Sequence, residues 1–193
     1  MPLTREAFAA SGKNTYFDHN ATAPIASFIK EAIPKLVEEW GNAGSIHFNG
    51  RGPKAILRES RQKLSGFLGC HPLELVFTSG GSESNNYALS GMVDWCLKNN
   101  RNHFLISSLE HPSIIKTCEY LATKGIDIDY IPVDRGGAID LTYIKNKISK
   151  KTGLVSVMLA NNETGSIFPV KEICSIAHEN GAYMHCDGVQ ALG

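Results

Sequence analysis

Four apolar, strand-like runs of the chain each end in a short cluster of polar and small residues, and helix-like segments separate the runs. The clusters follow residues 78, 108, 160 and 186. Strands that alternate with helices predict βαβ units, and therefore a mostly parallel sheet flanked by helices. Ligands of such sheets bind beyond the carboxyl ends of the strands. We therefore expect an α/β fold in which the four clusters together form one site.

The hydrophobic periodicity also gives the expected elements. The expected strands cover residues 73–78, 103–108, 127–132, 154–160 and 183–186. The expected helices cover residues 27–40, 53–68, 83–97, about ten residues from Pro112, 141–149 and 170–180. Pro34 should kink or break the first of these helices, because proline has no N–H for the helical hydrogen bond. Pro53 suits the first turn of the second helix.

Composition and charge argue against several classes of protein. The 193 residues contain 19 Lys+Arg and 19 Asp+Glu, and no basic run stands out, so a nucleic-acid surface has no electrostatic support. No stretch approaches the roughly 18 apolar residues that a membrane span needs. Residues 1–15 lack the apolar core of a signal peptide. We therefore expect a cytoplasmic protein that binds neither nucleic acid nor a membrane.

The cysteines favour a reducing compartment. There are five: Cys70, Cys96, Cys118, Cys174 and Cys186. Because they form no CxxC pair and their number is odd, we expect neither a disulfide framework nor a zinc ribbon. Most of them should be small buried apolar residues. Cys174 and His178 share one helix face, but His185 and Cys186 have no register with them, so we expect no metal site.

Two of the polar clusters suit a phosphorylated cofactor. In Ser79-Gly80-Gly81-Ser82, glycines would let the backbone approach a ligand, and free N–H groups at a helix start attract an anion such as phosphate. A plain strand–helix turn with a serine cap explains the same residues. Asp187 follows an apolar strand, and the protonated ring nitrogen of pyridoxal phosphate (PLP) is a cationic partner that suits a buried carboxylate. A helix N-cap explains Asp187 equally well.

Three further side chains lie at strand exits: His111, Asn162 and Gln190. His111 suits stacking on an aromatic ring or proton transfer. The two amides suit a phenolic oxygen, because an amide donates a hydrogen bond without adding charge. Taken alone, each of the three is more often structural.

The same residues resemble the cysteine desulfurase family. Residues 17–24 (FDHNATAP) and 41–47 (GNAGSIH) resemble its N-terminal arm, and residues 77–86 (FTSGGSESNN) resemble its phosphate loop. Residues 110–112 (EHP), 161–165 (NNETG) and 187–190 (DGVQ) match in order and in approximate spacing. Such motifs in one order are highly specific, although each alone is weak. The resemblance covers essentially the whole chain, and NNETG favours the group that supplies sulfur for iron–sulfur clusters and tRNA thiolation over selenocysteine lyases.

The resemblance implies a type I PLP-transferase large domain. Residues 1–26 would be an N-terminal arm and residues 27–193 the N-terminal part of the large domain, truncated before its C-terminal half and without the small C-terminal domain. The resemblance also implies the site. The backbone of Gly81 and Ser82 would hold the phosphate, His111 would stack over the ring and take part in proton transfer, Asn162 and Gln190 would face the phenolic oxygen, and Asp187 would pair with the ring nitrogen.

The sequence also departs from the family's pattern. In the family a Ser-x-His-Lys motif, which contains the Schiff-base lysine, follows the Asp-x-x-Gln turn, whereas this sequence stops at Gly193. The nucleophilic cysteine of the family lies later still, and none of the five cysteines matches it. We therefore expect the isolated chain to be inactive.

The resemblance implies the partners as well: L-cysteine as substrate, a second copy in a homodimer, a complementary C-terminal half, and a sulfur-acceptor or scaffold protein. Two other hypotheses stay open at this point. One is a non-catalytic binding or assembly module that keeps the fold, and the other is a different type I PLP lyase or aminotransferase. A downstream Ser-x-His-Lys segment would separate the enzyme from the module.

Overall fold

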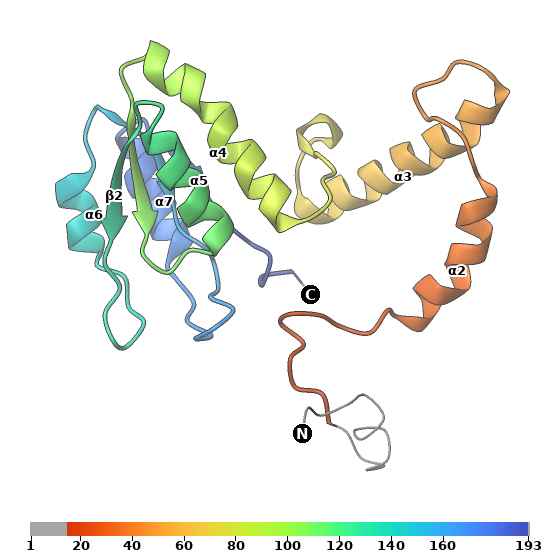
Figure 1. The fold of residues 1–193 in the computed structure, drawn as a ribbon, viewed down its shortest axis with the longest axis horizontal. Helices are drawn as coiled ribbons and strands as arrows, with labels where there is room; N and C mark the ends of the chain where they lie inside the picture. Colours follow the sequence, from red (N-terminus) through yellow and green to blue (C-terminus); the bar gives the residue numbers. More distant parts are fainter. Residues whose placement is uncertain (1–14, 193) are drawn as a thin grey trace. The chain divides into compact units, whose positions relative to one another are not determined.

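The computed structural model describes residues 15–192, and the chain divides between Phe77 and Thr78 into two compact units (Figure 1). Residues 1–14, where the expected N-terminal arm begins and the signal-peptide argument falls, lie outside the described residues, as does Gly193. The expected division into an arm over residues 1–26 and a domain over residues 27–193 stays a prediction. Every predicted site residue lies in the second unit.

The second unit is a parallel sheet flanked by helices, as the alternating pattern predicts. Its strands are β1 (His103–Ser107), β2 (Asp127–Ile131), β3 (Thr152–Ser156) and β4 (Tyr183–His185), in the order β2-β1-β3-β4. Its helices are α4 (Gly81–Lys98), α5 (Pro112–Ala122), α6 (Leu141–Lys147) and α7 (Val170–Glu179). Neighbouring strands all pair in parallel. The α/β prediction is therefore confirmed.

Alternate side chains of β1 bury into two separate cores, one on each face of the sheet. Phe104 and Ile106 join residues of α4 and α5, such as Leu89 and Ile114. Leu105 joins the other core, which includes residues of α6 and α7. Because successive side chains of a strand point to opposite faces, α4 and α5 cover one face and α6 and α7 cover the other, as Figure 1 shows. The carboxyl ends of all four strands meet at one edge.

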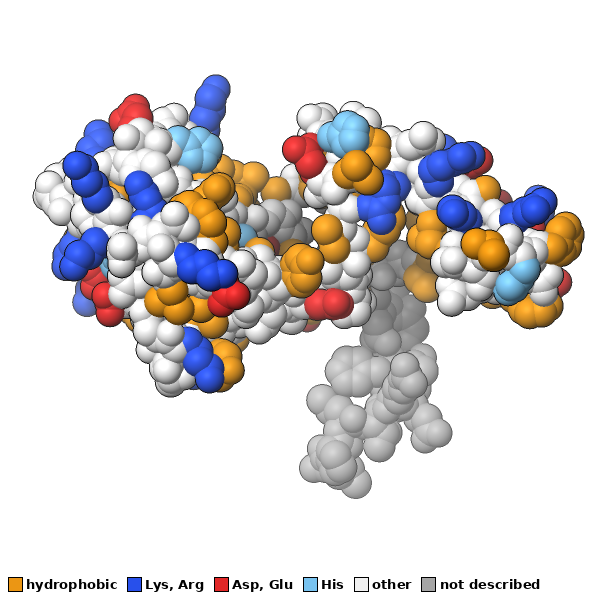
Figure 2. Space-filling view, turned by 90° about the horizontal axis from the view of Figure 1, so that it is seen from above, with side chains coloured by type: hydrophobic (Ala, Val, Ile, Leu, Met, Phe, Trp, Pro, Cys, Tyr) orange, Lys and Arg blue, Asp and Glu red, His pale blue; other side chains and the backbone are white. Residues whose placement is uncertain are grey.

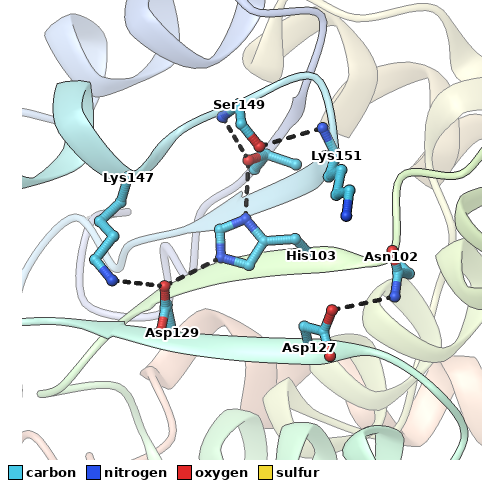
Figure 3. Close-up of polar contacts among 8 residues, drawn as sticks. Asn102, His103, Asp127, Asp129, Lys147, Ser149 and Lys151 are labelled. Atoms are coloured by element: carbon cyan, nitrogen blue, oxygen red, sulfur yellow. Dashed lines mark hydrogen bonds and ion pairs between the residues drawn. The ribbon is translucent and has the colours of Figure 1, made fainter.

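The opposite, amino edge of the sheet is held by a polar cluster around His103 (Figure 3). The His103 ring contacts Thr152 Oγ1 at 2.9 Å through Nδ1 and Asp129 Oδ2 at 3.5 Å through Nε2. Lys147 Nζ lies 3.3 Å from the same Asp129 oxygen. Burial lowers the pKa of His103, against the opposing effect of Asp129. This cluster ties β1, β2, β3 and the end of α6 together, on the side of the sheet away from the predicted site.

The first unit contains α2 (Ser27–Glu38), η1 (Phe48–Gly50), α3 (Arg51–Leu68) and η2 (Pro72–Glu74). The helix α2 continues through Pro34, so Pro34 does not break it, and the alternative of a kink there stays a prediction. Apart from the half-buried Ala32, every residue of α2 is exposed. Hydrophobic side chains are visible at the surface among Lys and Arg on the face that Figure 2 shows. The first unit therefore presents apolar surface that its own described residues do not cover.

The strand expected over residues 73–78 is wrong. Its first residues form η2 instead, because the His71 side chain accepts the Leu73 N–H and the Glu74 carboxylate accepts the His71 N–H, a capping box with Pro72 at the first position. Residues 75–78 pair with no strand among the described residues. The Arg61 side chain donates to the Leu75 carbonyl and stacks over the Phe77 ring at 4.9 Å. Side-chain contacts, not a sheet ladder, hold this segment.

Candidate functional site

Asp187 lies two residues beyond the end of β4 and is half-buried. The Asn85 Nδ2 group donates to its Oδ2 at 2.9 Å, and the Val189 N–H donates to its Oδ1 at 3.0 Å. The Asp187 carbonyl accepts the Leu159 N–H at 3.0 Å, so the backbone pairing of β3 and β4 continues past the named strands. Both carboxylate oxygens are therefore oriented by donors from two different elements.

The start of α4 lies beside this turn. A Cβ atom added to Gly81 would lie 3.0 Å from the Val189 side chain, a tight contact that shows how closely the two segments approach. The N-cap residue Gly80 provides no side-chain cap. Glu83 accepts hydrogen bonds from Ser79 N and Ser79 Oγ, both at 2.6 Å, and these hydrogen bonds lower the pKa of Glu83. The loop preceding α4 is thus fixed by Glu83, and the exposed Ser82 follows Gly81 in the first turn.

His111 lies beyond β1 and is the N-cap of α5. Its Nδ1 atom accepts the Ser113 N–H at 3.1 Å and lies 2.7 Å from Ser113 Oγ. Pro112 occupies the first helical position, where the missing N–H costs nothing. The imidazole ring is exposed, so one nitrogen fixes the helix start while the ring stays accessible.

Glu110, directly before His111, is only 6% exposed. Its Oε1 atom accepts the Met158 N–H at 2.7 Å, and among the described residues its Oε2 atom has no hydrogen-bond partner. Burial raises the pKa of Glu110 from 4.5 to about 7, the Met158 hydrogen bond opposes the shift, and the Asp187 charge adds to it. The Glu110 carboxyl group, which follows β1, thus contacts the backbone beyond β3 at Met158. Its raised pKa leaves it partly protonated near neutral pH.

The exit of β3 is organised by Asn161. Its Nδ2 group donates to the Leu109 carbonyl at 3.0 Å, and its Oδ1 atom accepts the N–H groups of Glu163 and Thr164 at 2.9 and 2.8 Å. The neighbouring Asn162 is half-buried and donates to Glu163 Oε1 at 2.9 Å. Asn161 therefore builds the turn that carries the predicted site residue Asn162.

These contacts link several of the predicted site residues. Asn85 and Ser113 connect Asp187 to His111. Gly81 joins them through Val189. Asn162 lies on the β3 exit, and the exposed Gln190 lies in the turn closed by the Ala191 N–H and the Gly188 carbonyl. Convergence of Ser82, Asn162 and Gln190 with the others on one ring-sized space stays a prediction.

Sequence reasoning assigned no role to four polar residues that contact or adjoin the predicted site residues: Asn85, Glu110, Ser113 and Asn161. One signal for Asn85 was present. Helical spacing places Asn85 on the same face as the apolar residues Leu89 and Cys96. The structure buries this face of α4, whereas the adjacent Asn86 is exposed. Glu110 and Asn161 lie next to predicted residues, but their partners Met158 and Leu109 are 48 and 52 positions away in the sequence. The spacing of the motifs does not reveal such contacts.

The cysteines differ from the expectation. Only Cys96 and Cys118 are buried, and burial raises their pKa values to about 11 and about 12, which disfavours the reactive thiolate. Cys70 and Cys174 are half-buried and Cys186 is exposed. Cys174 Sγ lies 3.7 Å from each ring nitrogen of His178. Within residues 15–192, no three His, Cys, Asp or Glu side chains are grouped to hold a metal ion, and no helix there is long and apolar enough to cross a membrane.

Comparison with known proteins identifies relatives of the whole chain. The aminotransferase class-V family matches residues 15–193. The cysteine desulfurase IscS of Dictyoglomus turgidum is 40% identical over 182 residues, covering 94% of this chain and 46% of the relative. That of Methanosarcina thermophila is 39% identical over 189 residues, covering 97% and 46%. The probable mitochondrial cysteine desulfurase of Dictyostelium discoideum is 35% identical and covers 100% and 43%.

Solved structures agree with these relatives. A NifS-like protein superimposes with a TM-score of 0.84 at 32% identity, over 90% of this chain and 48% of that chain. DndA from Streptomyces lividans superimposes with a TM-score of 0.79 at 34% identity, over 92% and 50%. The chain therefore spans about half the length of the relatives that it matches.

Proposed function

Because the chain belongs to the aminotransferase class-V family, whose members are PLP enzymes, we propose that it forms the N-terminal half of a cysteine desulfurase. The reaction is the conversion of L-cysteine to L-alanine, with the sulfur left on the enzyme as a persulfide. The relatives described above are named cysteine desulfurases, and their alignment with essentially all of this chain supports the proposal.

One observation carries the proposal. Asp187 beyond β4 is joined to His111 beyond β1 by hydrogen bonds through Asn85 and Ser113, and Gly81 at the start of α4 lies against the same turn. A carboxylate, an accessible imidazole and a glycine-led helix start are thus brought to one edge of a parallel sheet, where ligands of such folds bind.

The residues present fit PLP. The start of α4 has no side-chain cap from Gly80, which suits an anion such as the phosphate group at the first N–H groups of the helix. Asp187 has both oxygens oriented by N–H donors, which suits the protonated ring nitrogen. Asn162 and Gln190 would donate to the phenolic oxygen from the two neighbouring turns.

Bound PLP would supply an electron sink for the bonds at the substrate's Cα. The residues of this chain would hold and orient it. The backbone N–H groups of Gly81 and Ser82 would bind the phosphate, and Asp187 would keep the ring nitrogen protonated. Because Nδ1 of His111 is engaged by Ser113, Nε2 is the atom that would exchange a proton near the substrate.

The remaining catalytic groups would come from the other half of the family's length. We propose that a lysine and a nucleophilic cysteine are supplied there, since none of the five cysteines here matches the family nucleophile and two of them are buried with raised pKa values. A homodimer, a sulfur-acceptor or scaffold protein, and a cytoplasmic location complete the proposal. No observation favours a non-catalytic module or a different PLP activity.

The test is the reaction of the native protein that contains this chain. It should be purified with PLP, its intact mass should be measured, and alanine formation from L-cysteine should be followed for the wild type and for Asp187→Asn. Loss of the ring-nitrogen partner should lower kcat/KM by about 100-fold. Asp94→Asn, an exposed position on α4, is the matched control and should keep the wild-type rate. Absence of alanine from the native holoprotein, or an unchanged rate in Asp187→Asn, would refute the proposal.

A further inference from the structure

Asn85 makes two hydrogen bonds from one amide nitrogen. Its Nδ2 group donates to Asp187 Oδ2 at 2.9 Å and to Ser113 Oγ at 3.0 Å. The side chain is 5% exposed, so both donors are used away from water. The two acceptors come from different parts of the second unit, the turn beyond β4 and the first turn of α5.

The directions of these hydrogen bonds are fixed by chemistry. The Asp187 carboxylate accepts from Asn85, so the nitrogen of the amide faces it. The Ser113 N–H donates to His111 Nδ1, so this ring nitrogen presents its lone pair. The Ser113 hydroxyl, which accepts from Asn85, lies 2.7 Å from the same Nδ1, so its hydrogen can share this lone pair with the backbone N–H. Together the two Ser113 donors favour a neutral His111 ring that carries its hydrogen on Nε2.

We propose that Asn85 is a positioning residue that fixes Asp187 directly and, through Ser113, holds His111 in the tautomer with hydrogen on Nε2. This inference rests on the proposed function, which assigns Asp187 to the ring nitrogen of PLP and His111 to proton transfer. Asn85 and Ser113 act through these two residues and need not touch the cofactor or the substrate. A reacting side chain is kept in one orientation by hydrogen bonds from neighbouring residues that do not themselves react.

The position of Asn85 on α4 adds to this role. Gly81, which begins α4, lies four positions earlier and therefore about one helical turn away. The same rigid helix thus carries the glycine-led start and the amide that holds the other two groups.

The matched control is the next residue. Asn86 has the same side chain, but it is exposed and contacts Ser82 and Thr117 instead: its Nδ2 donates to the Ser82 carbonyl at 2.8 Å and its Oδ1 accepts from Thr117 Oγ1 at 2.7 Å. No hydrogen bond from Asn86 reaches Asp187, Ser113 or His111 among those that join the described residues. An effect of Asn85 that Asn86 lacks is therefore an effect of the network.

The experiment is ¹⁵N NMR of histidine rings in the full chain without cofactor, at a pH where His111 is neutral. The variant His111→Gln assigns the His111 signals by their loss. In the wild type, one ring nitrogen should resonate as protonated and the other as unprotonated, with the hydrogen on Nε2. In Ser113→Ala, where the backbone N–H is the one donor of residue 113 left to Nδ1, and in Asn85→Leu, the two signals should move part of the way toward each other as the second tautomer gains population. Ser113→Thr, which restores the hydroxyl, and Asn86→Ala should both give the wild-type pattern.

Asn85→Leu removes a buried amide, so its amide spectrum must first show the wild-type fold, and Ser113→Ala carries the test alone if it does not. A hydrogen on Nδ1 in the wild type, or a separation of the two ring-nitrogen signals in Ser113→Ala identical to that of the wild type, would overturn the inference. Because no cofactor is present, these outcomes are independent of PLP binding. Failure of the proposed function would appear separately, as absence of PLP-dependent activity.

Discussion

Glu110 places an ionisable carboxyl group inside the edge of the sheet where the site lies. Burial raises its pKa from 4.5 to about 7, and the Asp187 charge acts in the same direction. A carboxyl whose pKa is higher in the folded state binds more protons there than in the unfolded chain. The stability that this provides is fully present below pH 4.5 and is lost as the pH rises through about 7. Glu110 therefore makes the second unit less stable as the solution becomes more basic.

Replacing the Glu110 carboxyl group by an amide should remove the contribution of this residue to the pH dependence of the free energy of unfolding. In Glu110→Gln, the side-chain oxygen can still accept the Met158 N–H, but the group does not ionise. Relative to this variant, the wild type should lose about 2–3 kcal/mol in free energy of unfolding between pH 4.5 and about 7. Urea denaturation at several pH values measures the difference. Glu179→Gln, at an exposed position on α7, should retain the wild-type pH profile.

If the free energies of unfolding of the wild type and Glu110→Gln differ by the same amount across this pH range, Glu110 is not buried in the folded protein as described.

At the level of single residues, the sequence predicted those that carry recognisable chemistry. Asp187 and His111 stand next to turns at strand ends, and motif order marked them. Asn85 was not recognised as a site residue, because its partner Asp187 is 102 positions away and the register between α4 and the β4 exit depends on packing. Glu110 has no signal of its own, since burial of a carboxyl beside a loop is a property of the folded chain.

At the scale of elements, Gly153 in β3 shows how closely the sheet packs against the end of α4. A Cβ atom added there would lie 2.3 Å from the Arg101 carbonyl oxygen and 2.6 Å from Cys96 Sγ. Backbone cannot move aside as a flexible side chain can, so the strand and the segment after α4 would be forced apart.

Gly153→Ala should therefore destabilise the second unit by about 1–3 kcal/mol, the usual cost of overpacking. Gly91→Ala is the control, because Gly91 lies in the exposed part of α4 with no atom within 4 Å of the added Cβ. It should stabilise by about 0.5–1 kcal/mol, since alanine is the better helix former. Thermal or urea unfolding compares the two. Equal effects of both substitutions would contradict the packing described for β3.

The elements also show what local sequence can and cannot predict. Helices with strong periodicity begin and end within a few residues of the expected positions, for example α3 at Arg51–Leu68 and α7 at Val170–Glu179. The apolar run at residues 73–78 was expected to be a strand. A strand needs a neighbour, and no described strand pairs with this run. Local turn chemistry at Pro72 then determines its first residues.

At the scale of the whole molecule, α2 is a helix that buries none of its side chains against the described residues. It spans 12 residues, none of them buried, although it carries Phe28, Ile33 and Val37. An isolated helix of this length is marginal in water, because helices in proteins are stabilised mainly by packing of an apolar face. We therefore expect the stability of α2 to depend on association.

Hydrogen exchange of residues 27–38 should slow as the protein concentration rises, while sedimentation shows larger species over the same range. Exchange of β1, in the buried sheet, is the internal control and should not change with concentration. A monodisperse monomer whose α2 amides are protected equally at all concentrations would contradict this expectation.

The central claim is that the second unit forms half of a PLP site, and pyridoxamine 5′-phosphate tests it directly. This compound has the ring and phosphate of PLP but no aldehyde, so surface lysines cannot capture it covalently. An amide NMR titration of the full chain should show saturable shifts at Gly81, Ser82 and Gly188, accompanied by shifts of the His111 ring. Asp187→Ala should weaken binding by about 10-fold or more, the effect of losing one charge-assisted pair, while Asp94→Ala should bind as the wild type does. Saturable shifts that are identical in Asp187→Ala, or shifts confined to residues outside the start of α4 and the exits of β1, β3 and β4, would contradict the account.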